Sequence, residues 1–196
     1  MDKKELLIAE MTIGDGCIQR KSFELTHCEK QYEYLIWKRN ILLANDIDCG
    51  KVRQKNNNGF VAYKFTTKSY DWIADLRKEI YTPIKTYDLD ILKEFDALGL
   101  AIWYFDDGCL SQKKKNGKIH ANDLILNTGL QKEENQVYID YFKEYWDIHF
   151  TQVKDHNCYK LRCGTKEARK YIDIIKDHIV PCMSYKTTIK PSQVLS

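Results

Sequence analysis

The sequence predicts an α+β fold of two similar halves, each with its elements in the order α-β-β-α-β-β-α. Three observations predict it: an internal repeat, strand and helix periodicities in the same order on both sides of the repeat, and turn residues between paired strands. We divide the chain into a first half, residues 1–90, and a second half, residues 91–196. No Gly/Ser-rich linker separates them, so the halves are expected to pack as one body.

The repeat is clearest in two mostly apolar segments that each end in Asp-Gly. Leu6–Ile18 reads LLIAEMTIGDGCI and Leu98–Leu110 reads LGLAIWYFDDGCL. Matched residues lie 92 positions apart, among them Ala9/Ala101, Asp15/Asp107, Gly16/Gly108 and Cys17/Cys109. Each segment predicts an apolar helix, because its length and composition suit one and glycine commonly follows a helix end.

The remaining elements also come in pairs. Strands are predicted over Phe23–His27 and Asp123–Thr128, and amphipathic helices over Lys30–Asn45 and Lys132–Trp146. Hairpins follow, Val52–Lys55 with Phe60–Thr67 around Asn-Asn-Asn-Gly, and Phe150–Lys154 with Cys158–Cys163 around Asp-His-Asn. The last helices are Tyr70–Ile80 and Glu167–Ile175, and the halves join through a loop at Pro83–Asp90 and a short helical lead-in. Core packing accounts for most aromatic residues, including Trp37, Trp72, Trp103 and Trp146.

Composition limits the class of protein. Hydrophobic residues make up 43% and charged residues 30%, which is the balance of a globular domain with a core. A net charge of +3 permits a nucleic-acid partner without indicating one. Seven cysteines without a Cys-x-x-Cys pair fit reduced thiols, and no run of 18 apolar residues is present. We therefore expect an intracellular protein, in the cytoplasm of a prokaryote or phage-infected cell or in an organelle matrix, and neither secreted nor bound to a membrane.

The two Asp-Gly endings indicate a cation site. A single Asp-Gly would be an ordinary helix end. A carboxylate at the negative end of a helix, however, costs about 0.3–1 kcal/mol of helix stability, and this chain has such a carboxylate at both helix ends. If the helices pack side by side through Ala9 and Ala101, their ends bring Asp15 and Asp107 together. Two carboxylates beside a phosphate suit Mg²⁺ and hydrolysis by two metal ions.

These residues resemble the LAGLIDADG homing endonucleases that carry two motifs in one chain. Gly14-Asp15-Gly16 and Asp106-Asp107-Gly108 match the motif ends, and LAIWYFDDG at 100–108, LILNT at 124–128 and PCMSYKT at 181–187 resemble the same branch. The resemblance implies that the LAGLIDADG helices form the interface between the halves and that two antiparallel sheets form a DNA-binding saddle. It assigns catalysis and metal binding to Asp15 and Asp107, with further metal contacts from the backbone carbonyls of Gly14 and Asp106.

The resemblance also implies an active-site lysine after the last helix of each half. Pro83-Ile84-Lys85-Thr86 and Ser184-Tyr185-Lys186-Thr187 occupy those places, so Lys85 and Lys186 are expected to stabilise charge on the phosphate or to orient water. The alternative is that both are solvated surface lysines. At the end of the second strand, where the family often has Gln or another polar residue, this chain has His27 and Gly129, which is a departure.

DNA contacts are expected from the sheet faces and their connections, because a two-stranded ribbon fits the major groove. The candidates are Arg20, Lys21, Glu24, His27, Arg53, Lys55, Lys64, Lys68, Lys154, Lys160 and Arg162. A basic hairpin tip, Lys113 to Lys118 and including Lys115, either contacts the DNA backbone or is a solvated loop.

The predicted function is Mg²⁺-dependent cleavage of both strands of a long asymmetric double-stranded DNA target by a monomer, with 3′ overhangs implied by the resemblance. Mn²⁺ is expected to substitute, and Ca²⁺ to support binding without cleavage. The main alternative is an intron maturase that binds intron RNA on the same fold. A regulator that has lost the metal would have a degraded acidic pair, which Asp15 and Asp107 do not show. We expect an intron-encoded or free-standing protein rather than an intein, because the first motif starts at residue 6 and the chain ends in Val-Leu-Ser.

Overall fold

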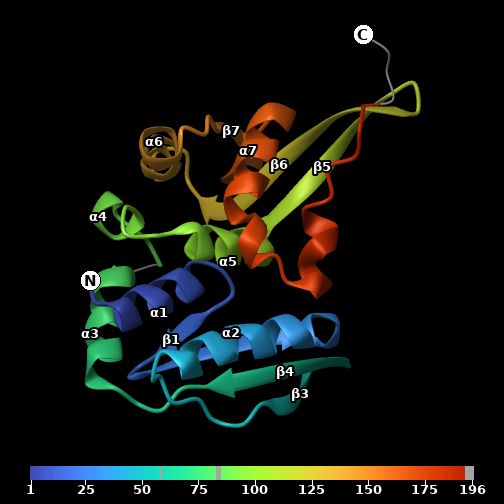
Figure 1. Cartoon of the computed structure of the whole chain (residues 1–196). Coiled ribbons are helices and arrows are strands. Elements are labelled where there is room, and N and C mark those ends of the chain that lie inside the picture. The colour runs from blue at the N-terminus through green and yellow to red at the C-terminus, as the bar shows by residue number, and fades with distance from the viewer. Residues whose placement is uncertain (58, 83–84, 193–196) are drawn as a thin grey trace.

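Two four-stranded antiparallel sheets lie on either side of a central pair of helices in the computed structural model, which describes residues 1–57, 59–82 and 85–192 (Figure 1). The first sheet has the order β1-β2-β4-β3, and the second has the order β5-β6-β8-β7. Their strands are β1 (Cys17–Gln19), β2 (Ser22–Cys28), β3 (Arg53–Asn57), β4 (Phe60–Thr66), β5 (Gly108–Lys115), β6 (Lys118–Leu130), β7 (Thr151–Asp155) and β8 (Cys158–Cys163). The shared order confirms the predicted α+β fold with two similar halves.

The helices divide into a central pair and outer helices. The central pair is α1 (Lys3–Ile13) and α5 (Ala97–Asp107), which pack against each other. In the first half α2 (Tyr32–Ala44) and α3 (Asp71–Ile80) pack on the sheet, and in the second half α6 (Asn135–Trp146) and α7 (Thr165–Ile175) do so. The short α4 (Leu89–Leu92) precedes α5, and three 3-10 segments complete the chain: η1 (Glu29–Gln31), η2 (Lys176–His178) and η3 (Pro181–Lys186). None of the helices that the structure describes is long and apolar enough to cross a membrane.

The central helices start at strong caps and are then buried almost all round. The Asp2 side chain accepts hydrogen bonds from the backbone of Lys4 and Glu5, and the Glu5 side chain accepts one from the Asp2 backbone amide, which completes a capping box. In α5 the Asp96 side chain accepts from the Leu98 backbone at 2.7 Å. Every residue of α1 from Leu7 onward is buried. A helix that is buried on all sides belongs at the centre of a fold.

Buried tyrosines fix the central pair from the surrounding elements. The hydroxyl of Tyr87 donates to the Ala9 carbonyl at 3.0 Å, and that of Tyr171 donates to the Leu100 carbonyl at 3.0 Å. These carbonyls already serve the helix, so the tyrosine hydroxyls are satisfied without breaking it. Ala9 and Ala101 are fully buried, as expected for two helices that approach closely.

The elements differ from the sequence predictions mainly at their ends. β6 is longer than the predicted Asp123–Thr128, because it continues into a hairpin with β5 around Asn116 and Gly117, which both have positive φ. The predicted helix Lys30–Asn45 begins as η1 and continues as α2. Asn58, within the predicted Asn-Asn-Asn-Gly turn, and Pro83 and Ile84, within the first lysine-containing repeat, lie outside the described residues.

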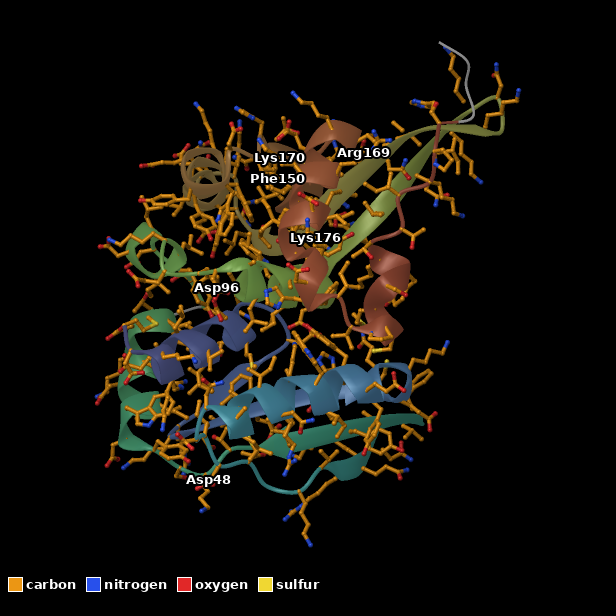
Figure 2. All side chains as sticks on the ribbon, viewed as in Figure 1. Asp48, Asp96, Phe150, Arg169, Lys170 and Lys176 are labelled. Carbon is orange, nitrogen blue, oxygen red and sulfur yellow. The ribbon has the colours of Figure 1, made fainter. Side chains whose placement is uncertain are left out.

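A buried acid, Glu10, lies on α1 where the two halves meet. It is 1% exposed, and its Oε1 accepts a hydrogen bond of 3.3 Å from the backbone of Asp96. Figure 2 labels Asp96, which lies between the two halves. A Cβ on Gly99 would lie 2.5 Å from the same oxygen, so only glycine leaves room for this carboxyl. Burial, and then the charge of Asp96, raises the pKa of Glu10 from 4.5 to about 8.

Replacing Glu10 with Gln is therefore expected to change how stability depends on pH. Because the folded-state pKa is raised, the folded protein binds the Glu10 proton more tightly, and this contribution to stability is complete below pH 4.5 and is lost as pH rises to about 8. Glu10→Gln should remove that loss. Urea unfolding of both proteins from about pH 5 to about pH 9 measures it, since all other groups are shared. Parallel free-energy curves for the two proteins would contradict the expectation.

Candidate active site

The ends of α1 and α5 meet at the centre of the molecule. Gly14 caps α1 and Gly108 caps α5, so Asp15 follows the first helix end and Asp107 is the last residue of the second. A Cβ on Gly14 would lie 2.4 Å from the Cβ of Asp106, so the two helix ends touch and a side chain at position 14 would not fit. Neither helix has a basic residue in its last turn to offset the acids.

Three carboxylates share this small volume. The Asp15 side chain is 44% exposed, whereas that of Asp106 is fully buried. Burial, and then the negative charge of Asp106, raises the pKa of Asp15. Burial, followed by the charges of Asp15 and Asp106, raises the pKa of Asp107 to about 7. The structure thus brings Asp15 and Asp107 together at the two helix ends, and each would hold its proton more tightly than an isolated aspartate does.

Each helix end is covered by a lysine from its own half. Lys85 Nζ donates to the carbonyl oxygens of Thr12 at 2.8 Å and Gly14 at 2.7 Å. Lys186 Nζ, from η3, donates to the carbonyl oxygen of Phe105 at 2.7 Å and to that of Asp106 at 3.4 Å. Burial lowers the pKa of both lysines. The structure therefore places Lys85 and Lys186 at equivalent positions beside the acids, and neither is a free surface lysine.

The oxygen atoms at the helix ends fit a divalent cation. Burial, and then neighbouring negative charge, raises the pKa values of Asp15 and Asp107, and a cation between these carboxylates would offset both effects. Asp15, Asp107 and the carbonyls of Gly14 and Asp106 are oxygen donors, which hard cations prefer. One further grouping was not predicted: Asp15, His27 and Asp106 each offer a ligand atom, and these atoms lie within 4.8 Å of one another.

Lys38 at this site was missed from the sequence. It lies on α2, its side chain is fully buried, and its Nζ contacts both carboxylate oxygens of Asp106 at 2.7 Å. A signal was available: Lys38 occupies a core position of the helix, between the buried Leu35 and Leu42 at spacings of three and four residues. A charge at such a position is rare unless it is paired.

His27 was placed among the DNA contacts, and this prediction is wrong. The residue is 3% exposed, and its Nδ1 lies 3.5 Å from Oδ2 of Asp15. Residues alternate along a strand, and His27 shares the inner face of β2 with Phe23 and Leu25, which are buried. Burial, and then the charge of Lys38, lowers its pKa to about 4, so the imidazole is neutral at pH 7.

The match between His27 and Gly129 also needs correction. His27 pairs with Tyr63 of β4, and Leu126 pairs with Leu161 of β8. Phe23 and Asn122 give the register, because their backbone amides donate to Thr67 and Thr165, which begin equivalent segments. This register matches His27 to Leu126, whereas the pairing of Cys17 with Glu24 and of Cys109 with Ile125 matches it to Thr128. The two registers differ by two residues, and neither matches His27 to Gly129.

Most of the predicted DNA contacts lie on the open faces of the sheets or at their ends. Lys64 pairs with Arg53 across β3 and β4, on the face opposite the buried Phe65. In the second sheet, Lys113 and Arg162 both approach Asp123, at 3.6 and 3.8 Å, on the face opposite the buried Leu161. Lys55 and Lys160 share these faces by strand alternation. Several of the basic groups have acidic neighbours: Lys21 with Asp71, Lys64 with Glu24, Lys68 with Asp48 and Lys160 with Asp155.

Three predicted contacts stand apart from these open faces. Lys154 pairs with Tyr159 while its neighbour two residues earlier, Gln152, pairs with the buried Leu161, so Lys154 points to the helix-covered side. Lys154 is exposed near the end of the edge strand β7, so its contact with DNA stays a prediction. Lys115 ends β5 at the tip of a hairpin that projects beyond the body of the second half (Figure 1). Arg20 has positive φ in the β1–β2 turn.

A protein-family model describes this arrangement over most of the chain. The model of the LAGLIDADG DNA endonuclease family matches residues 9–171, which include the C-terminal part of α1, all of α5 and both sheets. The chain belongs to the LAGLIDADG DNA endonuclease family. The predicted resemblance to two-motif LAGLIDADG homing endonucleases is thereby confirmed.

Relatives in this family differ in length and name. "Uncharacterized protein MJ1098" of Methanocaldococcus jannaschii is 24% identical, over 92% of this chain and 70% of its own length. "Protein RecA" of Mycobacterium shimoidei is 34% identical over 94% of this chain, which spans only 46% of that protein. "Probable intron-encoded DNA endonuclease 3" of Mycosarcoma maydis is 26% identical over 62% of this chain. The chain thus spans less than half the length of some relatives that it matches.

Solved LAGLIDADG structures share the fold. The homing endonuclease I-WcaI, bound to its DNA recognition sequence, superposes with a TM-score of 0.74 at 18% identity, over 96% of this chain and 86% of that chain. The meganuclease I-AabMI, bound to uncleaved DNA, gives a TM-score of 0.54 at 12% identity, over 86% and 83%. At these identities the similarity shows the fold: paired central helices with one antiparallel sheet on each side.

Proposed function

We propose that this LAGLIDADG protein is a sequence-specific homing endonuclease that hydrolyses both strands of a long, asymmetric double-stranded DNA target, requires Mg²⁺ and leaves 3′ overhangs. The observation that carries the proposal is the meeting of two acidic helix ends, each covered by a lysine of its own half. The DNA complexes of I-WcaI and I-AabMI support a duplex partner. The halves 1–90 and 91–196 would each contact part of the target, as one monomer inside the cell.

The acids would bind metal at each scissile phosphate, and the lysines would stabilise its negative charge. Asp15 and Asp107, with the carbonyls of Gly14 and Asp106, would hold divalent cations, and the I-DmoI complex with DNA and Mn supports a divalent metal. Bound Mg²⁺ would supply positive charge at the scissile phosphate and acidify the attacking water. Lys85 and Lys186 would turn from the carbonyls that they now contact toward the developing negative charge on the phosphate. No side-chain nucleophile would be needed, because the water oxygen would bond to phosphorus as one P–O bond of the phosphodiester breaks, and the leaving oxygen would take a proton from solvent.

The test is selection of the target by cleavage. Purified protein is incubated with Mg²⁺ and a randomised duplex library, in parallel with the Asp107→Asn variant, and the cut ends are sequenced. Cuts at one long asymmetric sequence, with 3′ overhangs and absent for the variant, would support the proposal. Absence of metal-dependent cutting, together with selective binding to a structured intron RNA, would contradict the endonuclease function and favour the intron maturase.

Lys85→Ala and Lys186→Ala are expected to slow cleavage at the selected target. Removing one charge-stabilising donor from an active site commonly lowers the rate about 100-fold or more, so we expect a single-turnover rate reduced to that extent with nearly unchanged affinity. Lys143→Ala, which changes an exposed lysine of α6, is the matched control and should cut at the wild-type rate. If the two active-site variants lose affinity while the bound complex still cuts normally, the lysines position DNA and do not act in the chemistry.

A further inference from the structure

A buried polar cluster lies at the end of α1 and has members from both halves. It consists of His27 and Lys38 from the first half and the side chain of Asp106 from the second. Lys38 Nζ contacts both oxygens of Asp106 at 2.7 Å, and Oδ2 of Asp106 accepts a hydrogen bond of 2.9 Å from the Asp15 backbone. Lys38 Nζ also lies 3.4 Å from Nε2 of His27. Lys38 therefore connects, through two side chains, to the carboxylate that we assign to catalysis.

The cluster fixes the chemical state of His27. An ammonium only donates hydrogen bonds, so Nε2 of His27 accepts from Lys38 and the ring proton is on Nδ1. Nδ1 faces Oδ2 of Asp15 at 3.5 Å. Through His27, Lys38 thereby directs an N–H group at the Asp15 carboxylate. Through its ion pair with Asp106, it also fixes the Asp106 carboxylate against the Asp15 backbone.

The second half has no such cluster at the equivalent positions. The repeat matches Asp106 to Gly14, and the pairing of Cys17 with Glu24 and of Cys109 with Ile125 matches His27 to Thr128. Lys38 matches Tyr138, because each lies four residues before a residue with the same role at the helix end. The carbonyl of Leu42 accepts a hydrogen bond from the backbone of Ile47, and the carbonyl of Phe142 accepts one from the backbone of Ile148. The buried ion pair of the first half is thus replaced by Gly14 and Tyr138, and His27 by Thr128, whose hydroxyl donates to Oδ1 of Asn135 at 2.6 Å.

A small cavity takes the place of the cluster on that side. Its volume is about 30 Å³, which is enough for one water molecule, and its lining includes Ile13, Lys85 and Tyr138. The backbone of Asp107 is held differently as well, because its carbonyl accepts from Asn127 Nδ2 at 2.9 Å. Asp15 therefore has an ionic scaffold that extends across the interface between the halves, and Asp107 has a neutral one within its own half.

We propose that Lys38 is a positioning residue for Asp15 and acts through Asp106 and His27. Because only one half has this scaffold, the two DNA strands are cut at unequal rates. The inference rests on the proposed function, because strand cutting is its readout. The Lys38 side chain is fully buried against Asp106, so its proposed role is to hold the groups that hold Asp15. Misplacing a reacting group by about 1 Å can cost about 100-fold in rate, so loss of this scaffold affects one strand more than the other.

The experiment measures the two first-strand nicking rates on a supercoiled plasmid that carries the selected target. The variants are Lys38→Met and the double variant Lys38→Met/Asp106→Asn, which removes both buried charges and so keeps the core neutral if the single variant fails to fold. The ratio of the two nicking rates is expected to change by about tenfold or more in the folded variants. Tyr138→Phe, at the equivalent place in the second half, is the matched control and should keep the wild-type ratio.

The outcomes separate the two proposals. If the wild-type protein cuts no target with Mg²⁺, the endonuclease proposal fails and the positioning role falls with it. If the wild-type protein cuts and the double variant keeps both its fold and the wild-type ratio, only the role of Lys38 is overturned. A ¹⁵N NMR spectrum of the histidines gives a readout without DNA: His27 should lose its fixed Nδ1–H tautomer in the double variant, and an unchanged tautomer would also overturn the role.

Discussion

Asp15→Asn and Asp107→Asn are each expected to abolish double-strand cleavage while target binding stays largely intact. Asparagine keeps the shape of the side chain but removes the negative charge that would hold a divalent cation between the helix ends. A loss of about 1000-fold in single-turnover rate corresponds to about 4 kcal/mol of transition-state stabilisation, which is a reasonable effect for a metal ligand.

The measurement pairs cleavage with binding at the selected target. Cleavage is followed with Mg²⁺, and binding is measured with Ca²⁺ so that the wild-type complex is not consumed. Asp173→Asn, which changes an exposed acid of α7, is the control and should behave as wild type in both assays. Full cutting of both strands by either active-site variant would remove the metal-site assignment.

Lys38→Met is expected to cause the largest loss of stability among the substitutions considered. Removing one partner of a buried ion pair leaves the other charge uncompensated, which costs about 3–5 kcal/mol. Both side chains of the pair are fully buried, so water cannot replace the lost partner. For a chain of this length that loss lowers Tm by about 10 °C.

A double-mutant comparison shows whether the ion pair is the cause. Lys38→Met/Asp106→Asn should recover most of the lost Tm, because neither buried charge remains. Lys93→Met, which removes the partner of Asp90 in an exposed pair, should change the free energy of unfolding by less than about 0.5 kcal/mol. An equal loss for the single and double variants would show that Lys38 contributes packing rather than charge compensation.

Much of the fold could be predicted because each element carries its own pattern. Helical and strand periodicities gave β8 and the end of α3 at the observed residues, and the repeat of Asp15 and Asp107 gave the arrangement of two similar halves. The repeated lysines were found for the same reason, since Lys85 and Lys186 occupy matched positions in the two halves. A repeat supplies a second observation of each site within one chain.

The parts that could not be predicted depend on contacts between distant elements. His27 and Lys154 lie on the faces set by strand register, and a shift of one residue reverses the face. Lys38 breaks the repeat, so a search for matched residues passes over it. Its buried position became acceptable only once Asp106 came from the other half, and that pairing is set by the packing of α2 against α5.

The contact between Gly14 and Asp106 makes the two halves complementary rather than interchangeable. Two copies of the first half, joined as a symmetric pair, would bury two Lys38 ammonium groups with no carboxylate to neutralise them. Two copies of the second half would bring two Asp106 side chains together. In this protein one Asp106 side chain fits there only because the facing residue, Gly14, has no side chain. A chimaera built from halves of different relatives would therefore need a compatible acid, lysine and glycine, inherited as a set. These three positions therefore favour pairing between the two different halves over pairing between two copies of either one.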